Sequence, residues 1–299
     1  MPTRIFLDSG AYSAWSQGKP VDIQAYIDFI KEHEECFEVY ANLDDLTNPE
    51  QTWTNQEEME RQGLKPIPVY HLGEDEKYLH RCMTYPYFAV GGRSLQTISV
   101  LDGWFNHIFT LLCPKSNDYF PLCKVHGFGI TVPNLMHKYP WYSMDSSSWV
   151  QYGRYGMILI PQRKNGRPDY TRSAFKVFMS TRSPARREEG KHFSTLTDAE
   201  REYVLAYIES KRFPLGRSEF KQVNGEVYKL SPNEAWADLD KKRIDPKNRC
   251  VEVILEKGLI NDGSLRDELN LIWYQDLAHS IPAWPWQFKP RKSGFFGDR

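Results

Sequence analysis

Two aspartates, Asp8 and Asp145, stand in short and unusual sequence settings that could support chemistry. Each directly follows an apolar or aromatic run that predicts a strand, residues 5–7 before Asp8 and residues 141–144 before Asp145. Each is followed by small, hydroxylated residues that predict a loop. A carboxylate at the C-terminal end of a strand is where a barrel or an open α/β sheet places catalytic groups. Two such carboxylates suit substitution at the anomeric carbon of a sugar, in which one attacks the carbon and the other moves protons.

Each aspartate also has a structural interpretation. An isolated Asp-Ser-Gly sequence such as Asp8-Ser9-Gly10 most often caps a turn or a helix. A second aspartate, Asp145, in the same kind of setting reverses that preference. We therefore treat both residues as candidate catalytic groups.

Strands and helices alternate regularly over the first 160 residues. The apolar patterns predict strands at residues 4–7, 37–43, 66–71, 87–90, 122–125, 141–144 and 156–160, with helices at 22–35, 49–62, 74–83, 95–112 and 132–138. Such alternation is typical of βαβ units and a parallel sheet. Every predicted strand ends in a polar or glycine-rich cluster, which places the candidate residues on one face. The sequence therefore predicts a TIM-like (β/α)8 barrel, with a doubly wound sheet as the structural alternative.

The pattern weakens after residue 160. A basic, glycine-containing loop is predicted at residues 162–172, a helix capped by Thr197 at 196–211, and a short hairpin around Asn224-Gly225 at 220–230. We predict two parts of the chain. Residues 1–165 form the core of the α/β barrel, and residues 166–299 form a mixed α+β extension that completes it and contacts nucleic acid.

Charge is distributed unevenly, although the formal net charge is only -1. Residues 1–100 carry 8 Lys/Arg and 16 Asp/Glu, whereas residues 151–220 carry 14 Lys/Arg and 8 Asp/Glu. This asymmetry indicates either a polyanion that contacts the later segment or a solvated surface. The candidates for contact with phosphates follow Asp145 closely: Arg154, Arg163, Lys164, Arg167 and Arg172.

The strand ends, in this order, resemble the tRNA-guanine transglycosylase superfamily, and most of all its phage DpdA-like DNA-guanine transglycosylases. Five family motifs have counterparts here, over roughly residues 4–160: Asp8-Ser9-Gly10-Ala11-Tyr12-Ser13 for Asp-Ser-Gly-Gly-Phe-Gln, Leu43-Asp44-Asp45-Leu46 for Phe-Asp-Glu-Cys, Val90-Gly91-Gly92 for Gly-Gly, His126-Gly127-Phe128-Gly129-Ile130 for His-x-x-Gly-x-Gly, and Met144-Asp145 for Phe-Asp. The Cys-x-Cys-x-x-Cys…His zinc site of the tRNA enzymes has no counterpart, so we expect no structural zinc. The last 140 residues do not align with the family.

The resemblance implies a pentosyltransferase that replaces guanine in DNA with a 7-deazaguanine of the preQ0 type. Asp145 would be the nucleophile of a covalent Asp–deoxyribose intermediate, and Asp8 the acid/base group for the leaving and entering bases. The partners would be duplex DNA with a flipped guanine and a free 7-deazaguanine base. No cofactor is implied.

The resemblance also suggests how the base is bound. Asp44 would accept the N1 and N2 hydrogens of guanine, with Asp45 as the second choice or as a residue that holds the loop. Backbone N–H groups of Gly91 and Gly92 would approach the base carbonyl, because no side chain intervenes. The remaining candidates are Tyr12, which would stack on the base, Ser9 beside it, and His71 at the strand end where the family has a glutamine. We expect His126 to orient its own loop.

The cysteines and the apolar segments indicate the cellular compartment of the protein. Five cysteines without a tight repeat predict buried thiols in a reducing environment. The first residues lack the apolar segment of a signal peptide, and no stretch approaches about 18 apolar residues. We expect a cytoplasmic protein, in the host cytoplasm if a phage encodes it, with no membrane partner.

Three other functions are compatible with parts of this pattern. The same chemistry could act on RNA. A two-carboxylate glycoside hydrolase would use a stacking tryptophan near the strand ends, for which Trp149 is a candidate. A non-catalytic nucleic-acid-binding barrel would tolerate Asp145→Asn without loss of function.

Overall fold

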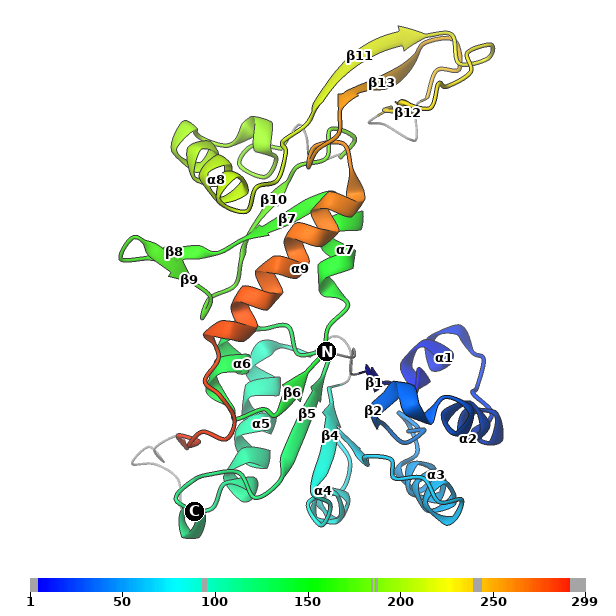
Figure 1. Cartoon of the computed structure of the whole chain (residues 1–299), viewed down its shortest axis with the longest axis vertical. Coiled ribbons are helices and arrows are strands. Elements are labelled where there is room, and N and C mark those ends of the chain that lie inside the picture. Colours follow the sequence, from blue (N-terminus) through cyan, green and yellow to red (C-terminus); the bar gives the residue numbers. More distant parts are fainter. Residues whose placement is uncertain (1–4, 93–95, 184, 186–187, 239–243, 291–299) are drawn as a thin grey trace. The chain divides into compact units, whose positions relative to one another are not determined.

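The computed structural model describes residues 5–92, 96–183, 185, 188–238 and 244–290 (Figure 1). Arg4 and Leu95, with which two of the predicted elements begin, lie outside the described residues, as does part of the basic stretch at 182–191. The chain divides into two compact units, residues 1–146 with 282–299 and residues 147–281. Each unit is described by itself.

The first unit is built on parallel strands, which confirms the mixed α/β class with parallel βα units. Its strands are β1 (Ile5–Leu7), β2 (Phe37–Tyr40), β3 (Val69–His71), β4 (Tyr87–Gly91), β5 (Lys124–Phe128) and β6 (Ser143–Met144). β1 pairs with β2, and β3, β4, β5 and β6 pair in that order, all in parallel. A parallel bridge between Ala41 and Ile67 joins the chain after β2 to the chain before β3.

Five helices of this unit occur where the sequence predicts them. They are α2 (Ile23–Glu32), α3 (Pro49–Arg61), α4 (Glu76–Cys82), α5 (Ile98–Leu112) and α6 (Pro133–Lys138). Side chains of Asp22, Asn48 and Thr97 cap α2, α3 and α5 by accepting a backbone N–H of the first turn. The loop predicted after Asp8 is wrong, because Gly10, with a φ of 72°, starts the short helix α1 (Ala11–Gln17) there.

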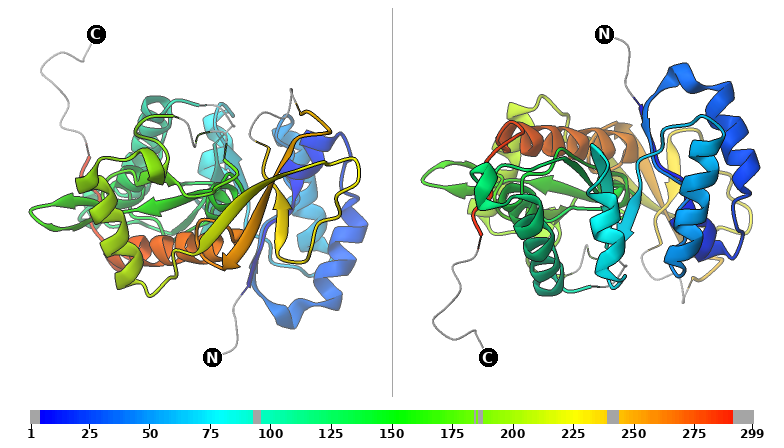
Figure 2. Two further views of the ribbon diagram at one scale, coloured as in Figure 1. Left: turned by 90° about the horizontal axis from the view of Figure 1, so that it is seen from above. Right: turned by 90° about the horizontal axis from the view of Figure 1, so that it is seen from below.

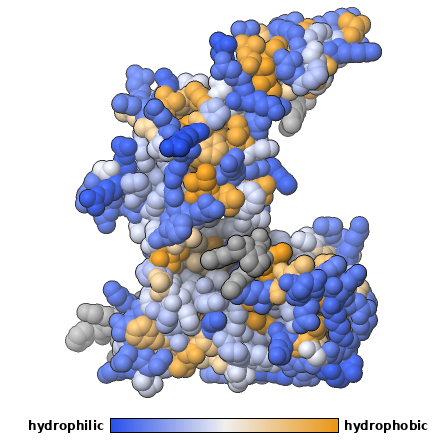
Figure 3. Space-filling view, in the orientation of Figure 1, coloured by the Kyte–Doolittle hydropathy of each residue, from blue (hydrophilic) through white to orange (hydrophobic). Residues whose placement is uncertain are grey.

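Two apolar clusters and one aromatic cluster make up the core of the first unit. Ile27, Ile30 and Met59 are fully buried where α2 and α3 pack with the β2 region. Between α5 and the β6 region, Phe109 lies 4.9 Å from Trp141 in a ring cluster that Phe288 of the C-terminal segment joins. The surface over α2 and α3 is largely hydrophilic (Figure 3).

The strands of the second unit, drawn in green to orange in Figure 2, pair in antiparallel fashion. Its elements are α7 (Ser148–Arg154), β7 (Met157–Ile160), β8 (Gln162–Lys164), β9 (Arg167–Asp169), β10 (Phe175–Phe178), α8 (Asp198–Ser210), β11 (Arg217–Val223), β12 (Glu234–Trp236), β13 (Arg249–Glu256) and α9 (Gly263–Ser280). β7, predicted as the seventh strand of the series, pairs in antiparallel fashion with β10. Helix α8, with Thr197 in a capping box, confirms the prediction for 196–211.

The predicted hairpin around Asn224-Gly225 is wrong, because β11 pairs instead with β13. A two-residue Asn-Gly hairpin occurs at Asn165-Gly166, within the predicted basic loop, where β8 pairs with β9. The φ angles of Asn165 and Gly166 are 53° and 78°, as a type I′ turn requires. The boundary predicted between residues 165 and 166 falls in this turn.

One buried amide, that of Asn270 on α9, links three elements of the second unit. Its Oδ1 accepts the Leu159 N–H at 2.8 Å, and its Nδ2 donates to the carbonyls of Met157 and Trp149 at 3.1 and 3.3 Å. The residue has no exposed surface. A single side chain therefore forms hydrogen bonds with three backbone groups from β7 and α7.

We expect Asn270→Leu to lower the free energy of unfolding by about 3 kcal/mol, because it leaves buried backbone groups without partners. Denaturant unfolding followed by circular dichroism measures this loss. Gln275→Leu, at an exposed position of the same helix, is the matched control and should change stability by less than about 0.5 kcal/mol. Equal effects of the two substitutions would contradict the role given to Asn270.

Candidate functional site

Three carboxylates converge at the C-terminal ends of the parallel strands in the first unit. Asp8 follows β1, Asp44 follows β2, and Asp145 follows β6. The negative charges of Asp44 and Asp145 both act on Asp8, so the three groups share one site. The ring of Phe6 in β1 also stacks on His126 of β5, with centroids 4.2 Å apart. The structure thus brings together two residues separated by 137 positions, the predicted pair Asp8 and Asp145.

Asp8 is a carboxyl that holds its proton more firmly than usual. Surrounding protein atoms limit its hydration, and the charges of Asp44 and Asp145 add to this effect, so the pKa of Asp8 is raised. The backbone N–H groups of Gly10 and Ser9 offset only part of the shift. Because the residue is exposed, a substrate can still reach it.

Asp145 has the opposite character. Loss of hydration alone would raise its pKa, but the His126 side chain and the Gly129 N–H outweigh that effect, and the pKa of Asp145 is lowered. Gly129 N–H donates to Oδ1 at 2.8 Å, and His126 Nε2 lies 3.6 Å from the same oxygen. The side chain is 49% exposed. Asp145 is therefore an accessible, ionised carboxylate with one oxygen held in place.

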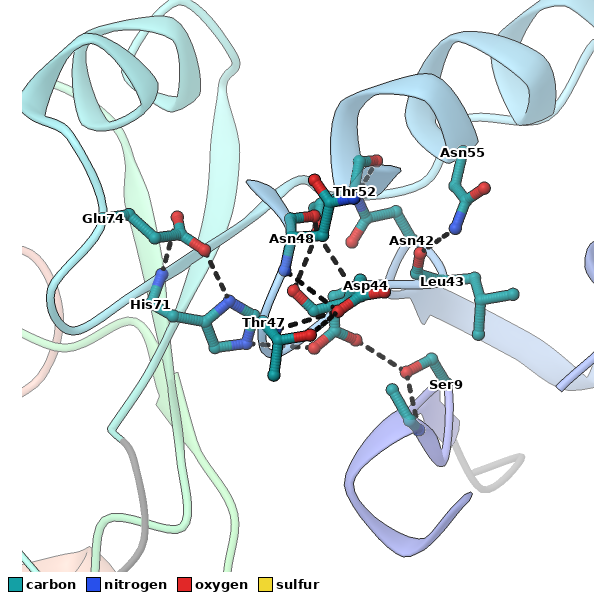
Figure 4. A network of polar contacts seen from close by, with 12 residues as sticks. Ser9, Asn42, Leu43, Asp44, Thr47, Asn48, Thr52, Asn55, His71 and Glu74 are labelled. Atoms are coloured by element: carbon teal, nitrogen blue, oxygen red, sulfur yellow. Dashed lines mark hydrogen bonds and ion pairs between the residues drawn. The ribbon is translucent and has the colours of Figure 1, made fainter. Parts of the chain in front are cut away.

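Asp44, His71 and Glu74 form a buried cluster in the site (Figure 4). His71 Nε2 lies 3.0 Å from Asp44 Oδ2, and its Nδ1 lies 3.0 Å from Glu74 Oε1. Burial alone would lower the pKa of His71, but hydrogen bonds and charge from the two carboxylates raise it to about 9. At neutral pH the buried imidazolium therefore joins two carboxylates. Sequence reasoning missed Glu74.

The remaining oxygen of Asp44 is bound by Ser9. The Ser9 hydroxyl donates to Asp44 Oδ1 at 2.8 Å and accepts the Ala11 N–H at 3.2 Å, where α1 begins (Figure 4). Ser9 is buried and Asp44 is 9% exposed. Two strand ends, those of β1 and β2, are thus tied together through one hydroxyl. The carboxylate of Asp44 retains lone pairs for a further donor.

Asp45, the second choice for base recognition, holds its own loop. Its Oδ1 accepts the N–H and the hydroxyl of Thr47 at 2.8 Å each, and the Asn48 N–H at 3.0 Å. Loss of hydration would raise the pKa of Asp45, but these donors lower it. The Asp45 N–H in turn donates to Thr52 of α3 at 2.8 Å. These bonds hold the loop that follows Asp44.

The absence of a side chain at Gly91 and Gly92 serves packing as much as access of a ligand to the backbone. Gly91 pairs with His71 across β3 and β4, and a Cβ atom there would lie 2.9 Å from His71 Cδ2. A side chain at Gly91 would therefore displace the imidazole. At Gly92 a Cβ atom would lie 3.1 Å from Leu101. The carbonyl of Gly91 already accepts the Leu72 N–H at 3.2 Å.

A pocket of about 570 Å³ opens beside Asp44. Its walls include Trp15 of α1, Val21 of the following loop and Leu43 after β2. Tyr12 lies on the same short helix, 52% exposed, with its ring 6.0 Å from that of Trp15. Polar side chains, among them Asp44, Asp45 and Asn55, line the rest of the pocket, and a pocket with apolar walls and carboxylates is suited to a planar ligand that carries hydrogen-bond donors.

All five cations predicted to contact phosphates are exposed, and they belong to the second unit. Lys164 and Arg167 flank the turn of the β8–β9 hairpin. Arg163 lies over the Tyr203 ring at 4.2 Å, and Arg172 pairs with Asp169 at 3.2 Å. Arg154 ends α7, and Trp149, the stacking candidate, lies half-buried on the same helix.

The cysteines are free thiols in the described residues. Cys82, Cys113 and Cys123 are buried as predicted, whereas Cys36 is exposed and Cys250 is half-buried. Within the described ranges, no group of three or more His, Cys, Asp or Glu side chains could hold a metal ion. No helix in that part of the chain is long and apolar enough to cross a membrane.

Comparison of the chain with family models, with curated proteins and with solved structures finds no match. The geometry and electrostatics of the carboxylate site therefore carry the assignment of a function.

We expect the imidazolium of His71 to make stability depend on pH. Its folded pKa of about 9 exceeds the ordinary value of 6.5, so its contribution is complete below about 6.5 and is lost as the pH rises through about 9. Between pH 5.5 and pH 9.5, wild type should lose on the order of 3 kcal/mol of unfolding free energy that His71→Gln does not lose. Urea unfolding at both pH values measures the difference.

His80→Gln is the matched control, because His80 is 61% exposed on α4 of the same unit. It should keep the wild-type pH dependence. If His71→Gln also kept it, the imidazole of His71 would not be charged in the folded chain.

Proposed function

We propose that this chain is a base-exchange transglycosylase that replaces guanine in DNA with a 7-deazaguanine of the preQ0 type. The observation that carries the proposal is the opposite shift of two carboxyl groups in one site, with the pKa of Asp8 raised and that of Asp145 lowered. Paired carboxyl groups whose environments separate their pKa values are suited to divide the roles of acid and nucleophile. The resemblance of the strand-end motifs to the transglycosylase superfamily supports the same assignment.

The reaction would proceed by two displacements at C1′ of the deoxyribose. Oδ2 of Asp145 attacks C1′ while the C1′–N9 bond to guanine breaks, and the leaving guanine takes a proton from Asp8. The incoming base then attacks C1′ through N9, the bond from C1′ to Asp145 breaks, and the N9 proton passes to Asp8. Both groups end in their starting states, and configuration at C1′ is retained.

Base recognition would fall to Asp44 and the pocket beside it. Two of its lone pairs are occupied by the Ser9 hydroxyl and by the imidazolium of His71. An ionised carboxylate accepts the N1 and N2 hydrogens of a guanine-type edge. Tyr12 and Trp15 on α1 would supply aromatic surface for the base, a contact worth about 1–3 kcal/mol.

The proposal includes a (β/α)8-type arrangement of the parallel βα units, since a carboxyl-end site is the hallmark of that fold. It also assigns the exposed cations of the second unit, including Lys164 and Arg167 on the β8–β9 hairpin, to the phosphates around a flipped guanine. These roles rest on charge, exposure and sequence position.

The decisive experiment is exchange of radiolabelled guanine into duplex DNA, with bulk tRNA in parallel. We expect label in DNA with wild type, no label with Asp145→Asn, and a loss of roughly 10²–10⁴-fold with Asp8→Asn, because the leaving base then lacks its proton donor. Asp28→Asn, at an exposed position on α2, is the matched control and should exchange at the wild-type rate.

Each alternative gives a different result in this assay. Label in tRNA alone would keep the mechanism and change the polymer. Full exchange by Asp145→Asn would remove the covalent mechanism. No label from guanine or from 7-cyano-7-deazaguanine in either polymer would overturn the proposed function.

We expect DNA binding to weaken steeply with salt, with a contribution from the β8–β9 hairpin. Replacing Arg163, Lys164 and Arg167 together by glutamine should reduce the slope of log K against log salt by about 3 if each contacts a phosphate. Fluorescence anisotropy with a labelled duplex measures the slope. Glutamine at Lys229, Lys247 and Lys257, three exposed lysines of the same unit, removes the same charge and should leave the slope unchanged. A flat salt response of wild type would contradict the assignment.

A further inference from the structure

A chain of hydrogen bonds leads through the sheet of the first unit toward Asp145. Tyr87 OH lies 2.5 Å from Ser143 Oγ, and Ser143 Oγ lies 2.6 Å from His126 Nδ1. On the other side of the ring, His126 Nε2 faces Asp145 Oδ1 at 3.6 Å. The register of the strands produces this chain, because His126 of β5 and Ser143 of β6 are direct partners.

The imidazole of His126 is held rigidly, yet one of its nitrogens lacks a hydrogen bond. His126 is 2% exposed and lies between Phe6, stacked at 4.2 Å, and Phe128, edge-on at 4.6 Å. Its Nε2 is buried and makes no hydrogen bond within the described residues. A buried, unpaired nitrogen is costly, and each such group in a folded protein calls for an explanation. It faces the carboxylate of Asp145, with Oδ1 at 3.6 Å.

The direction of the chain follows from the groups that form it. An ionised carboxylate only accepts, so we place a proton on Nε2 of His126, which faces Asp145. With Nδ1 as the acceptor, Ser143 donates to Nδ1, and Tyr87 donates to Ser143. The pKa of Tyr87 is raised to about 12, mainly by burial, so its hydroxyl keeps the proton that it donates. Every donor in the chain therefore points toward Asp145.

We propose that His126 is a positioning residue that acts on Asp145 through the Tyr87–Ser143–His126 hydrogen-bond chain and stabilises the Asp145 carboxylate as the leaving group of the second displacement. The inference rests on the proposed function for its catalytic part. In the covalent intermediate the ester oxygens carry little charge, and Nε2–H gains little from them. When the incoming base breaks the bond from C1′ to Oδ2, the electron pair returns to the carboxylate. Nε2–H then meets a full negative charge on Asp145, and the contact shortens.

The other groups that face Asp145 must be considered in any titration. His126 faces it from β5, the Gly129 N–H from the following loop, and Asp8 from the end of β1. Asp44 and Tyr26 act on Asp8 and thereby indirectly on Asp145. The coupling to Asp8 is removed when the titration is done in an Asp8→Asn background.

Two substitutions separate the two nitrogens of His126. Asparagine can place its amide near the position of Nδ1, so His126→Asn keeps the partner of Ser143 and loses the donor to Asp145. Glutamine can place its amide near the position of Nε2, so His126→Gln keeps the donor to Asp145 and loses Ser143. Circular dichroism and unfolding curves show whether each variant is folded, and the pair differs little in size or polarity.

The first measurement is the titration of the Asp145 carboxyl in the free protein, by NMR of carboxyl-labelled aspartate in the Asp8→Asn background. The signal is assigned with Asp145→Asn. We expect the pKa of Asp145 to rise in His126→Asn, to stay near the wild-type value in His126→Gln, and to rise slightly in Tyr87→Phe. A purely structural role of His126 would not move this titration in a donor-dependent way.

The second measurement is the covalent protein–DNA adduct at saturating guanine, separated on a denaturing gel. In His126→Asn the second displacement should slow by roughly 10- to 100-fold, so the adduct accumulates and exchange falls; His126→Gln should restore both. An unchanged titration in His126→Asn overturns the inference, whatever the exchange assay gives. A shifted titration without adduct in any variant, wild type included, overturns the proposed function and the leaving-group role but keeps the link between His126 and Asp145.

Discussion

The crowding of negative charge at one end of a parallel sheet is the constraint on which the site depends. Asp8, Asp44 and Asp145 approach closely enough that two of them raise the pKa of the third. Like charges at such range oppose folding unless donors or cations compensate them. In this chain the compensation is local: an imidazolium and a hydroxyl at Asp44, and a backbone N–H with an imidazole at Asp145. At Asp8 only the backbone N–H groups of Gly10 and Ser9 compensate the charge, and the pKa of this carboxyl is raised.

Two buried histidines thereby take different tasks. His71 is enclosed by two carboxylates, carries a charge and fixes Asp44 in the floor of the site. His126 has one carboxylate at longer range and a serine hydroxyl on its other side. One histidine thus forms a close ion pair with its aspartate, whereas the other lies 3.6 Å from its aspartate. Asp145 is thereby left 49% exposed, with a pKa below its usual range.

Sequence patterns predicted the parallel alternation and the order of the strand ends, because both depend on local apolar periodicity. They did not predict α1, since its start depends on the left-handed Gly10 and on the Ser9 hydroxyl rather than on helix-forming residues. Nor could they distinguish the pairing of β7, because a short apolar run reads alike in parallel and antiparallel sheets. The two Asn-Gly pairs carry the same local signal, and only distant partners decide which one forms a hairpin. Glu74 was missed because a turn at Gly73, with a φ of 91°, folds it back onto His71.

The division of the first unit into two stretches of sequence has a consequence for synthesis. Phe288, 2% exposed, completes an aromatic cluster whose other rings belong to residues 105–141. Its backbone N–H also donates to Tyr119 at 2.8 Å. Phe288 leaves the ribosome only after all of residues 147–281. The first unit therefore begins to fold while one ring of its aromatic cluster is still missing. The order of the chain therefore lets the second unit fold before this aromatic cluster of the first unit acquires its last ring.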